Sequence, residues 1–130
     1  MRKAQPEQPR GDPKVNTVLI TAAQMQQLRL NGLASVQGTA IDHHPVVKLF
    51  TPDGAATWLL TELDAADDDT AFGLCDLGMG CPELGYVSLA ELRTVRGRLG
   101  LPVERDRHFQ ADKPLSAYAE QAHQAGRIVT

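Results

Sequence analysis

The chain has 130 residues, of which 42% are hydrophobic, and it carries a formal net charge of −3 at pH 7. This length and composition predict one folded domain with a substantial core and exclude a wholly disordered protein. No long apolar run follows the basic first residues, so we expect neither a signal peptide nor a membrane-spanning helix. The sequence therefore indicates a soluble, cytoplasmic protein that has no contact with membranes.

The first sixteen residues differ in character from the rest. They contain three prolines and six charged residues and almost nothing apolar. A segment of this composition cannot bury enough apolar surface to offset the entropy lost on ordering. We therefore expect residues 1–16 to form a flexible N-terminal tail and residues 17–130 to form a single α+β domain.

Charge is divided unevenly along the chain. Between Ala40 and Leu92, ten carboxylates face one cation, Lys48, so this block carries −9 while the remaining residues carry +6. A surface of one sign steers association with surfaces of the opposite sign. The pattern therefore favours an acidic face whose partner is a protein with a basic surface.

The first half of the domain predicts one helix and a hairpin. Thr21 precedes apolar residues at helical spacing over 22–30, and Asn31-Gly32 is typical of a helix end. Residues 33–44 are expected to be a loop. Two β-rich runs, 46–50 and 55–63, flank a Pro-Asp-Gly turn and predict a β-hairpin. The only tryptophan, Trp58, lies on its second strand, and the sequence leaves open whether it is core or interface.

The second half predicts two further strands, two helices and a short strand between those helices. Alternation over residues 71–77 places Phe72, Leu74 and Asp76 on one face, so Asp76 is either a strand-end residue or an exception to the apolar pattern. A short strand is expected around Tyr86. A capping box at Ser88 starts a helix that ends at Gly97 or Gly100, and its expected apolar stripe consists of Leu89, Leu92, Val95 and Leu99. Residues 102–106 suit a strand, and residues 113–126 suit a last helix, with Pro114 in its first turn and Gly126 as its stop. The residues expected on its inward face are Leu115, Tyr118, Ala119 and Ala122. The fold class is α+β: an antiparallel sheet of three to five strands with about three covering helices.

The acidic connection 64–69 admits three interpretations, of which the simplest is a solvated turn that also discourages edge pairing. Clustered carboxylates on a loop are ligands for Mg²⁺ or Ca²⁺, although the spacing does not match an EF-hand. A divalent-cation-dependent hydrolase or nuclease would use Asp64, Asp67, Asp68, Asp76 and Glu83 as ligands. The third interpretation is a partner-binding face formed by Glu62, Asp64, Asp67, Asp68, Asp69, Asp76 and Glu83.

Other motifs carry weaker signals. Cys75 and Cys81 match neither a zinc knuckle nor a redox motif, so we expect ordinary thiols. Gly78-Met79-Gly80 lacks the third glycine of a nucleotide-binding loop, and we expect no cofactor. A basic patch could contact DNA, which is the third functional alternative although nucleic acid is not the favoured partner. Its members are Arg93, Arg96, Arg98, Arg105 and Arg107, of which the first three are expected on the helix that starts at Ser88.

Several runs appear in an order that resembles a known family: TWLLTEL, FGLCDLG, PELGYVSL and the closing ERD-x-x-F. Over residues 17–128 the chain resembles a family of small proteins of unknown function carried on bacterial plasmids and integrative conjugative elements. The resemblance implies the setting of a mobile-element accessory protein, near antirestriction genes in some elements. It supplies no catalytic residues.

These observations lead to one main hypothesis. We expect a non-enzymatic acidic interaction module, which could serve defence evasion by docking on a basic nucleic-acid-binding surface. The metal-dependent enzyme and the DNA-binding accessory are the alternatives. The oligomeric state is left open by the sequence.

Overall fold

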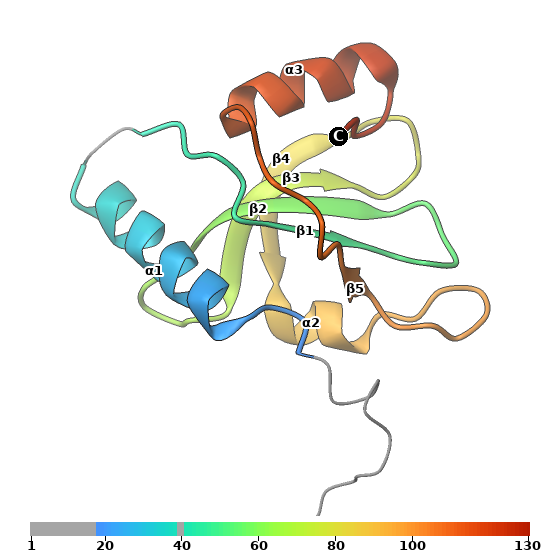
Figure 1. Cartoon of the computed structure of the whole chain (residues 1–130), viewed down its shortest axis with the longest axis horizontal. Coiled ribbons are helices and arrows are strands. Elements are labelled where there is room, and N and C mark those ends of the chain that lie inside the picture. Colours follow the sequence, from blue (N-terminus) through green and yellow to red (C-terminus); the bar gives the residue numbers. More distant parts are fainter. Residues whose placement is uncertain (1–17, 39–40) are drawn as a thin grey trace, which may run out of the picture.

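The computed structural model describes residues 18–38 and 41–130; the expected tail over 1–16 lies outside the described residues. The elements in chain order are α1 (Ala22–Val36), β1 (Val47–Phe50), β2 (Thr57–Leu63), β3 (Thr70–Asp76), β4 (Glu83–Ser88), α2 (Leu89–Thr94), β5 (Glu104–Arg105) and α3 (Leu115–Ala125) (Figure 1). The described residues form an α+β domain with a five-stranded antiparallel sheet in the order β4-β3-β2-β1-β5 and three helices, as the sequence predicts.

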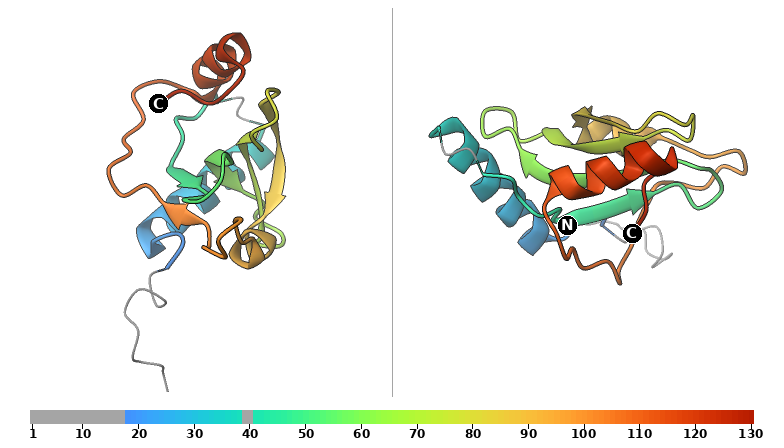
Figure 2. Two further views of the ribbon diagram at one scale, coloured as in Figure 1. Left: turned by 90° about the vertical axis from the view of Figure 1, so that its right-hand side faces the viewer. Right: turned by 90° about the horizontal axis from the view of Figure 1, so that it is seen from above.

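The sheet has a core on each face. On one face, α1 and α2 pack against alternate residues of the strands, including Val47, Trp58 and Leu60. On the other face, α3 packs against Leu59 and Leu74 (Figure 2). Trp58 is only 4% exposed, so it belongs to the core. Period-two alternation along each strand is what divides the side chains between the two cores.

Helix α1 begins as predicted and ends later than predicted. Thr21 and Gln24 form a reciprocal capping box. The helix then continues through Asn31-Gly32 to Val36, so the predicted stop and the first part of the predicted loop are wrong. Gly32 packs so closely on β2 that an added Cβ would lie 1.9 Å from the Leu63 carbonyl oxygen. Glycine is therefore required here for close packing and does not end the helix.

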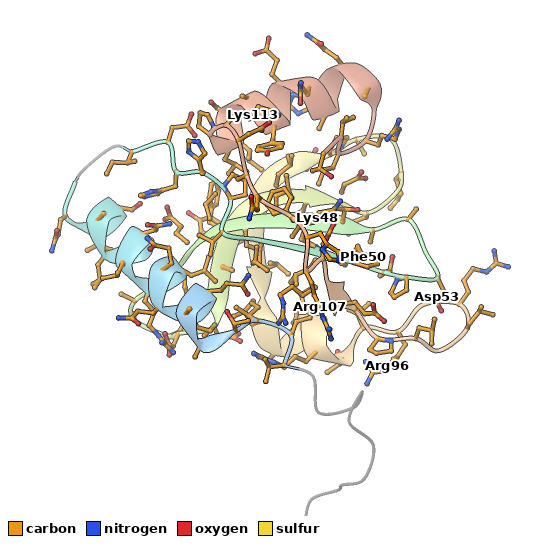
Figure 3. All side chains as sticks on the ribbon, in the orientation of Figure 1. Lys48, Phe50, Asp53, Arg96, Arg107 and Lys113 are labelled. Carbon is orange, nitrogen blue, oxygen red and sulfur yellow. The ribbon has the colours of Figure 1, made fainter. Side chains whose placement is uncertain are left out.

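Helix α2 begins at its predicted cap, Ser88, and ends at Thr94, before either expected glycine. Leu99, expected on its apolar stripe, is 81% exposed. The chain after α2 is held instead by Asp53, which lies in the β1–β2 turn beside that segment (Figure 3). Its Oδ2 accepts hydrogen bonds from the Leu99 and Leu101 amides. This long-range anchor replaces the last turns of the expected helix.

Helix α3 has the predicted buried face and the predicted stop, but it begins at Leu115, so Pro114 is its N-cap and not part of its first turn as expected. It follows Pro114 and ends at Gly126, whose φ of 77° is left-handed. Its buried residues, Leu115, Tyr118, Ala119 and Ala122, are the four expected. Proline has no side-chain hydrogen-bonding group, so this helix needs an N-terminal cap from elsewhere.

Candidate interaction surface

Two aspartates of the acidic block cap helices that lie far away in sequence. The Asp42 carboxylate accepts hydrogen bonds from the backbone N–H and the hydroxyl of Ser116, in the first turn of α3. Asp69 accepts from the Ala90 amide at 2.8 Å and from the Ser88 hydroxyl at 2.6 Å at the start of α2. A carboxylate at a helix N-terminus satisfies free N–H groups and complements the helix dipole. Part of the acidic surplus is therefore structural.

Asp76 is also a structural residue. It is 3% exposed, and its two oxygens accept hydrogen bonds from the Gly78 amide at 2.8 Å and the Ile128 amide at 2.9 Å. It shares its sheet face with Phe72 and Leu74, as the strand alternation predicts, and it anchors the segment after α3. Glu83 lies at the same end of the sheet, opposite Cys75 in the register. The structure thus separates Asp76 and Glu83 from the connection 64–69, which lies at the other end of β3.

The remaining five predicted carboxylates gather around the β2–β3 connection. We call this set the acidic end. Asp67 accepts hydrogen bonds from the Thr70 hydroxyl and amide and from the Asp69 amide, and these bonds lower its pKa. Asp68 accepts hydrogen bonds from Nε and Nη2 of the Arg29 guanidinium at 2.7 and 2.8 Å, and this pairing lowers the Asp68 pKa. The set comprises Glu62, Asp64, Asp67, Asp68 and Asp69.

A hollow of about 230 Å³ lies beside the acidic end, between the end of α1 and strands β2 to β4. Its lining includes Glu62 and Asp64 together with Val36 and Tyr86, which are 75% and 72% exposed. The Tyr86 ring stacks at a tilt on Phe72, with 5.0 Å between centroids. The strand register places Glu62 beside Phe72 and Phe72 beside Tyr86 on one face. Carboxylates and exposed apolar groups therefore share this hollow.

Sequence reasoning did not select Tyr86, Phe72 or Val36. The sequence shows a tyrosine on a short predicted strand after a glycine-rich loop. It does not show which acidic residues lie near that tyrosine in the fold. Only the β2–β3–β4 register joins Tyr86 to Glu62, which is 24 positions earlier in the chain.

The carboxylates do not converge as metal ligands would. Among residues 18–38 and 41–130, no three His, Cys, Asp or Glu side chains form a group that could hold a metal ion. In the acidic end, Asp64 and Asp67 bond to nearby amides of their own loop. Both cysteines are free thiols, and Cys75 is half-buried against the α1–α2 core, which raises its pKa. A raised pKa disfavours the reactive thiolate.

The predicted basic patch is dispersed. Of its members, only Arg93 lies on α2, so the expectation that Arg96 and Arg98 share that helix is wrong. The Arg96 guanidinium donates to the carbonyls of Arg93 and Val95, and that of Arg105 donates to those of Val18 and Leu19. Arg96 is part of the loop that follows α2, whereas Arg107 follows β5 and lies in front of the sheet (Figure 3). Two of the five arginines therefore donate hydrogen bonds to backbone carbonyls of this chain.

The fold and the surface define a small α+β domain. Helices cover both faces of its antiparallel sheet, and a hollow lined by acidic and aromatic side chains lies at one end. In the described ranges, no helix has the length and apolarity needed to cross a membrane. The chain belongs to a family of proteins of unknown function, DUF2958, whose model matches residues 19–129. Comparisons with curated proteins and with solved structures gave no match.

Proposed function

We propose that this protein is a non-enzymatic interaction module whose acidic end docks on a basic protein surface. The observation that carries the proposal is the hollow in which Glu62 and Asp64 lie beside the exposed side chains of Tyr86 and Val36. Protein interfaces typically combine aromatic anchors with a charged rim, and electrostatic complementarity gives them their partner selectivity.

The charge of this surface is nearly uncompensated. Arg29 pairs with Asp68, and no other salt bridge among the described residues involves the acidic end. Helix α1 terminates at the hollow and has no basic residue in its last turn. The negative end of its dipole therefore adds to the field of Glu62 and Asp64. A lysine or arginine side chain is the natural ligand for such a site.

This proposal uses a smaller set of residues than the sequence suggests. Asp76 is buried and Asp69 caps α2, so the docking groups are mainly Glu62, Asp64 and Asp67. Surfaces that bind nucleic-acid phosphate are rich in lysine and arginine. The mobile-element setting implied by the resemblance would place such partners among restriction and other defence proteins.

The test is affinity capture from lysates of bacteria that carry restriction systems. The bait is the full chain, compared with a Glu62→Gln/Asp64→Asn double variant, which removes two charges but keeps the acceptors for Ser35 and Ala66. The matched control is Glu104→Gln/Glu120→Gln, two exposed residues on β5 and α3. We expect a partner that the control retains and that the test variant, or 300 mM salt, releases. Equal capture by both variants would contradict the proposal.

A further inference from the structure

Strand β4 forms an open edge of the sheet. It pairs with β3 on one side, and no strand of the described chain lies on its other side (Figure 1). Natural edge strands use charged residues, above all lysine, and proline to discourage further pairing. Strand β4 has no lysine and no proline, and its one charged residue, Glu83, is at its first position. The opposite edge strand, β5, has only two residues. The β4 edge is thus long enough to accept another strand.

The direction of the free backbone groups follows from the ladder. The Leu89 amide donates to the Asp69 carbonyl at 2.9 Å, continuing the register of Val87 with Ala71 and Gly85 with Gly73. In an antiparallel pair, alternate residues bond inward and the residues between them point outward. The amides and carbonyls of Leu84 and Tyr86 therefore face away from β3 without a strand partner.

The side chains of the same two residues are also exposed. Leu84 and Tyr86 are 47% and 72% exposed, on the face that carries α3. Helix α3 covers Leu59 and Leu74 in the middle of that face. Nearer the acidic end, Tyr86, Phe72 and Glu62 lie side by side on β4, β3 and β2, and all three line the hollow. An apolar strip therefore joins the free edge to the carboxylates.

We propose that an extended segment of the partner adds to β4 as a sixth strand, parallel to β4, and that a basic residue following it enters the hollow. Strand β4 runs toward the acidic end, so a parallel strand ends there too. This inference rests on the proposed function and names the form of the partner. Alternate apolar side chains of the segment would pack on Leu84 and Tyr86, as in other cases of strand addition. The charge of Glu62 and Asp64 selects arginine or lysine as the residue that follows, and the Tyr86 ring offers a cation–π contact.

Strand spacing sets where the basic residue must be. Neighbouring strands lie about 4.8 Å apart, so β2, which carries Glu62, lies about 10 Å inside β4. An added strand would lie one strand spacing beyond β4, so a side chain within it would have to span about 14 Å to reach Glu62. The arginine or lysine therefore comes just after the paired residues, where the partner chain turns over Tyr86 onto the sheet.

The test uses amide hydrogen exchange of the full chain, measured by NMR. The probe is a peptide of eight alternating threonine and valine residues followed by glycine and two arginines. Two control peptides carry two glutamates in place of the arginines, or a proline in the middle of the repeat. At saturation with the arginine peptide, we expect exchange at the Leu84 and Tyr86 amides to slow by about tenfold or more, because these amides gain partners. The Gly85 and Val87 amides, already bonded to β3, serve as internal controls.

Substitutions identify the groups that select the peptide. We expect Glu62→Gln/Asp64→Asn and Tyr86→Ala each to weaken peptide binding by about two- to fivefold, as expected for exposed charge pairs and cation–π contacts. The Glu104→Gln/Glu120→Gln and Leu99→Ala variants are the matched controls and should bind normally. The glutamate and proline peptides should bind more weakly than the arginine peptide.

Three outcomes would overturn the inference. One is peptide binding without added protection of the Leu84 and Tyr86 amides. Another is equal binding of the arginine and glutamate peptides. The third is concentration-dependent protection of these amides in the protein alone, with a dimer in sedimentation, because a second copy would then occupy the edge. If the acidic variant loses its partner in lysates but the edge gains no protection, the proposed function stands and only the strand addition fails.

Discussion

Replacing Gly32 by alanine tests how closely α1 approaches the sheet. In an exposed helix this change stabilises by about 1 kcal/mol, because alanine has the higher helix propensity. Here the new Cβ would lie 1.9 Å from the Leu63 carbonyl oxygen, whereas real Cβ contacts stay beyond 3.0 Å. The helix must therefore move away from β2 by at least about 1 Å, and the 2.8 Å hydrogen bond from Asn31 to the Thr61 carbonyl must stretch or break.

The expected effect has the opposite sign to helix propensity. Overpacking costs about 1–3 kcal/mol, and a lost buried hydrogen bond adds about 1 kcal/mol, so the net loss is about 1–3 kcal/mol after the propensity gain. Urea denaturation followed by tryptophan fluorescence measures it, with Trp58 as the reporter. Gln26→Ala, at an exposed position of the same helix, should stay within about 0.5 kcal/mol of the parent. A Gly32→Ala protein as stable as the parent, or more stable, would refute the close packing.

Three further predictions concern stability. Asp42→Ala should lower the free energy of unfolding by about 0.5–2 kcal/mol by removing the cap of α3, and Asp42→Asn should lose less; both are measured by urea denaturation. The lowered pKa values of Asp67 and Asp68 mean that their ionised forms stabilise the native state fully above their unfolded pKa, near 3.9. That stabilisation should disappear as pH falls through the lower folded values, and Asp67→Asn should flatten this acid limb in a pH series of thermal melts. Trp58→Ala should cost about 3–5 kcal/mol and Leu99→Ala less than about 0.5 kcal/mol, in thermal unfolding followed by circular dichroism; equal losses would contradict the different burial of the two side chains.

Local signals predicted the elements whose ends depend on local chemistry. Pro114 and Gly126 mark the two ends of α3, and each does so through its own backbone conformation. Thr21 and Ser88 likewise start α1 and α2 at the predicted positions. The alternation of β3 placed even the buried Asp76 on the correct face.

The errors arose where distant contacts override local preference. Gly32 is typical of a helix end, yet in this fold its missing side chain lets α1 contact β2. Leu99 has helical spacing from Leu92, yet Asp53 holds that segment in a turn, 46 residues from its own position. Neither contact has a signature in the residues around it.

The candidate site was predictable in charge and not in geometry. The sequence shows the carboxylates at positions 62–69, but it does not show that Asp69 caps a helix or that Asp68 pairs with Arg29. The hollow exists because three strands align Glu62, Phe72 and Tyr86 in one row. Such a row depends on the register and on the β-bulge between Leu60 and Glu62, which sequence alternation does not reveal.

The anchoring of α3 has a consequence for synthesis of the chain. Its N-terminus is capped by Asp42 and the segment after it is bound by Asp76, both of which are made much earlier. Helix α3 leaves the ribosome only after the whole sheet has emerged. Until then, Leu59 and Leu74 have no cover, while α1, α2 and the opposite face can already pack. A chain at that point of synthesis exposes the apolar face that α3 covers in the folded protein, and exposed apolar surface of this kind favours aggregation.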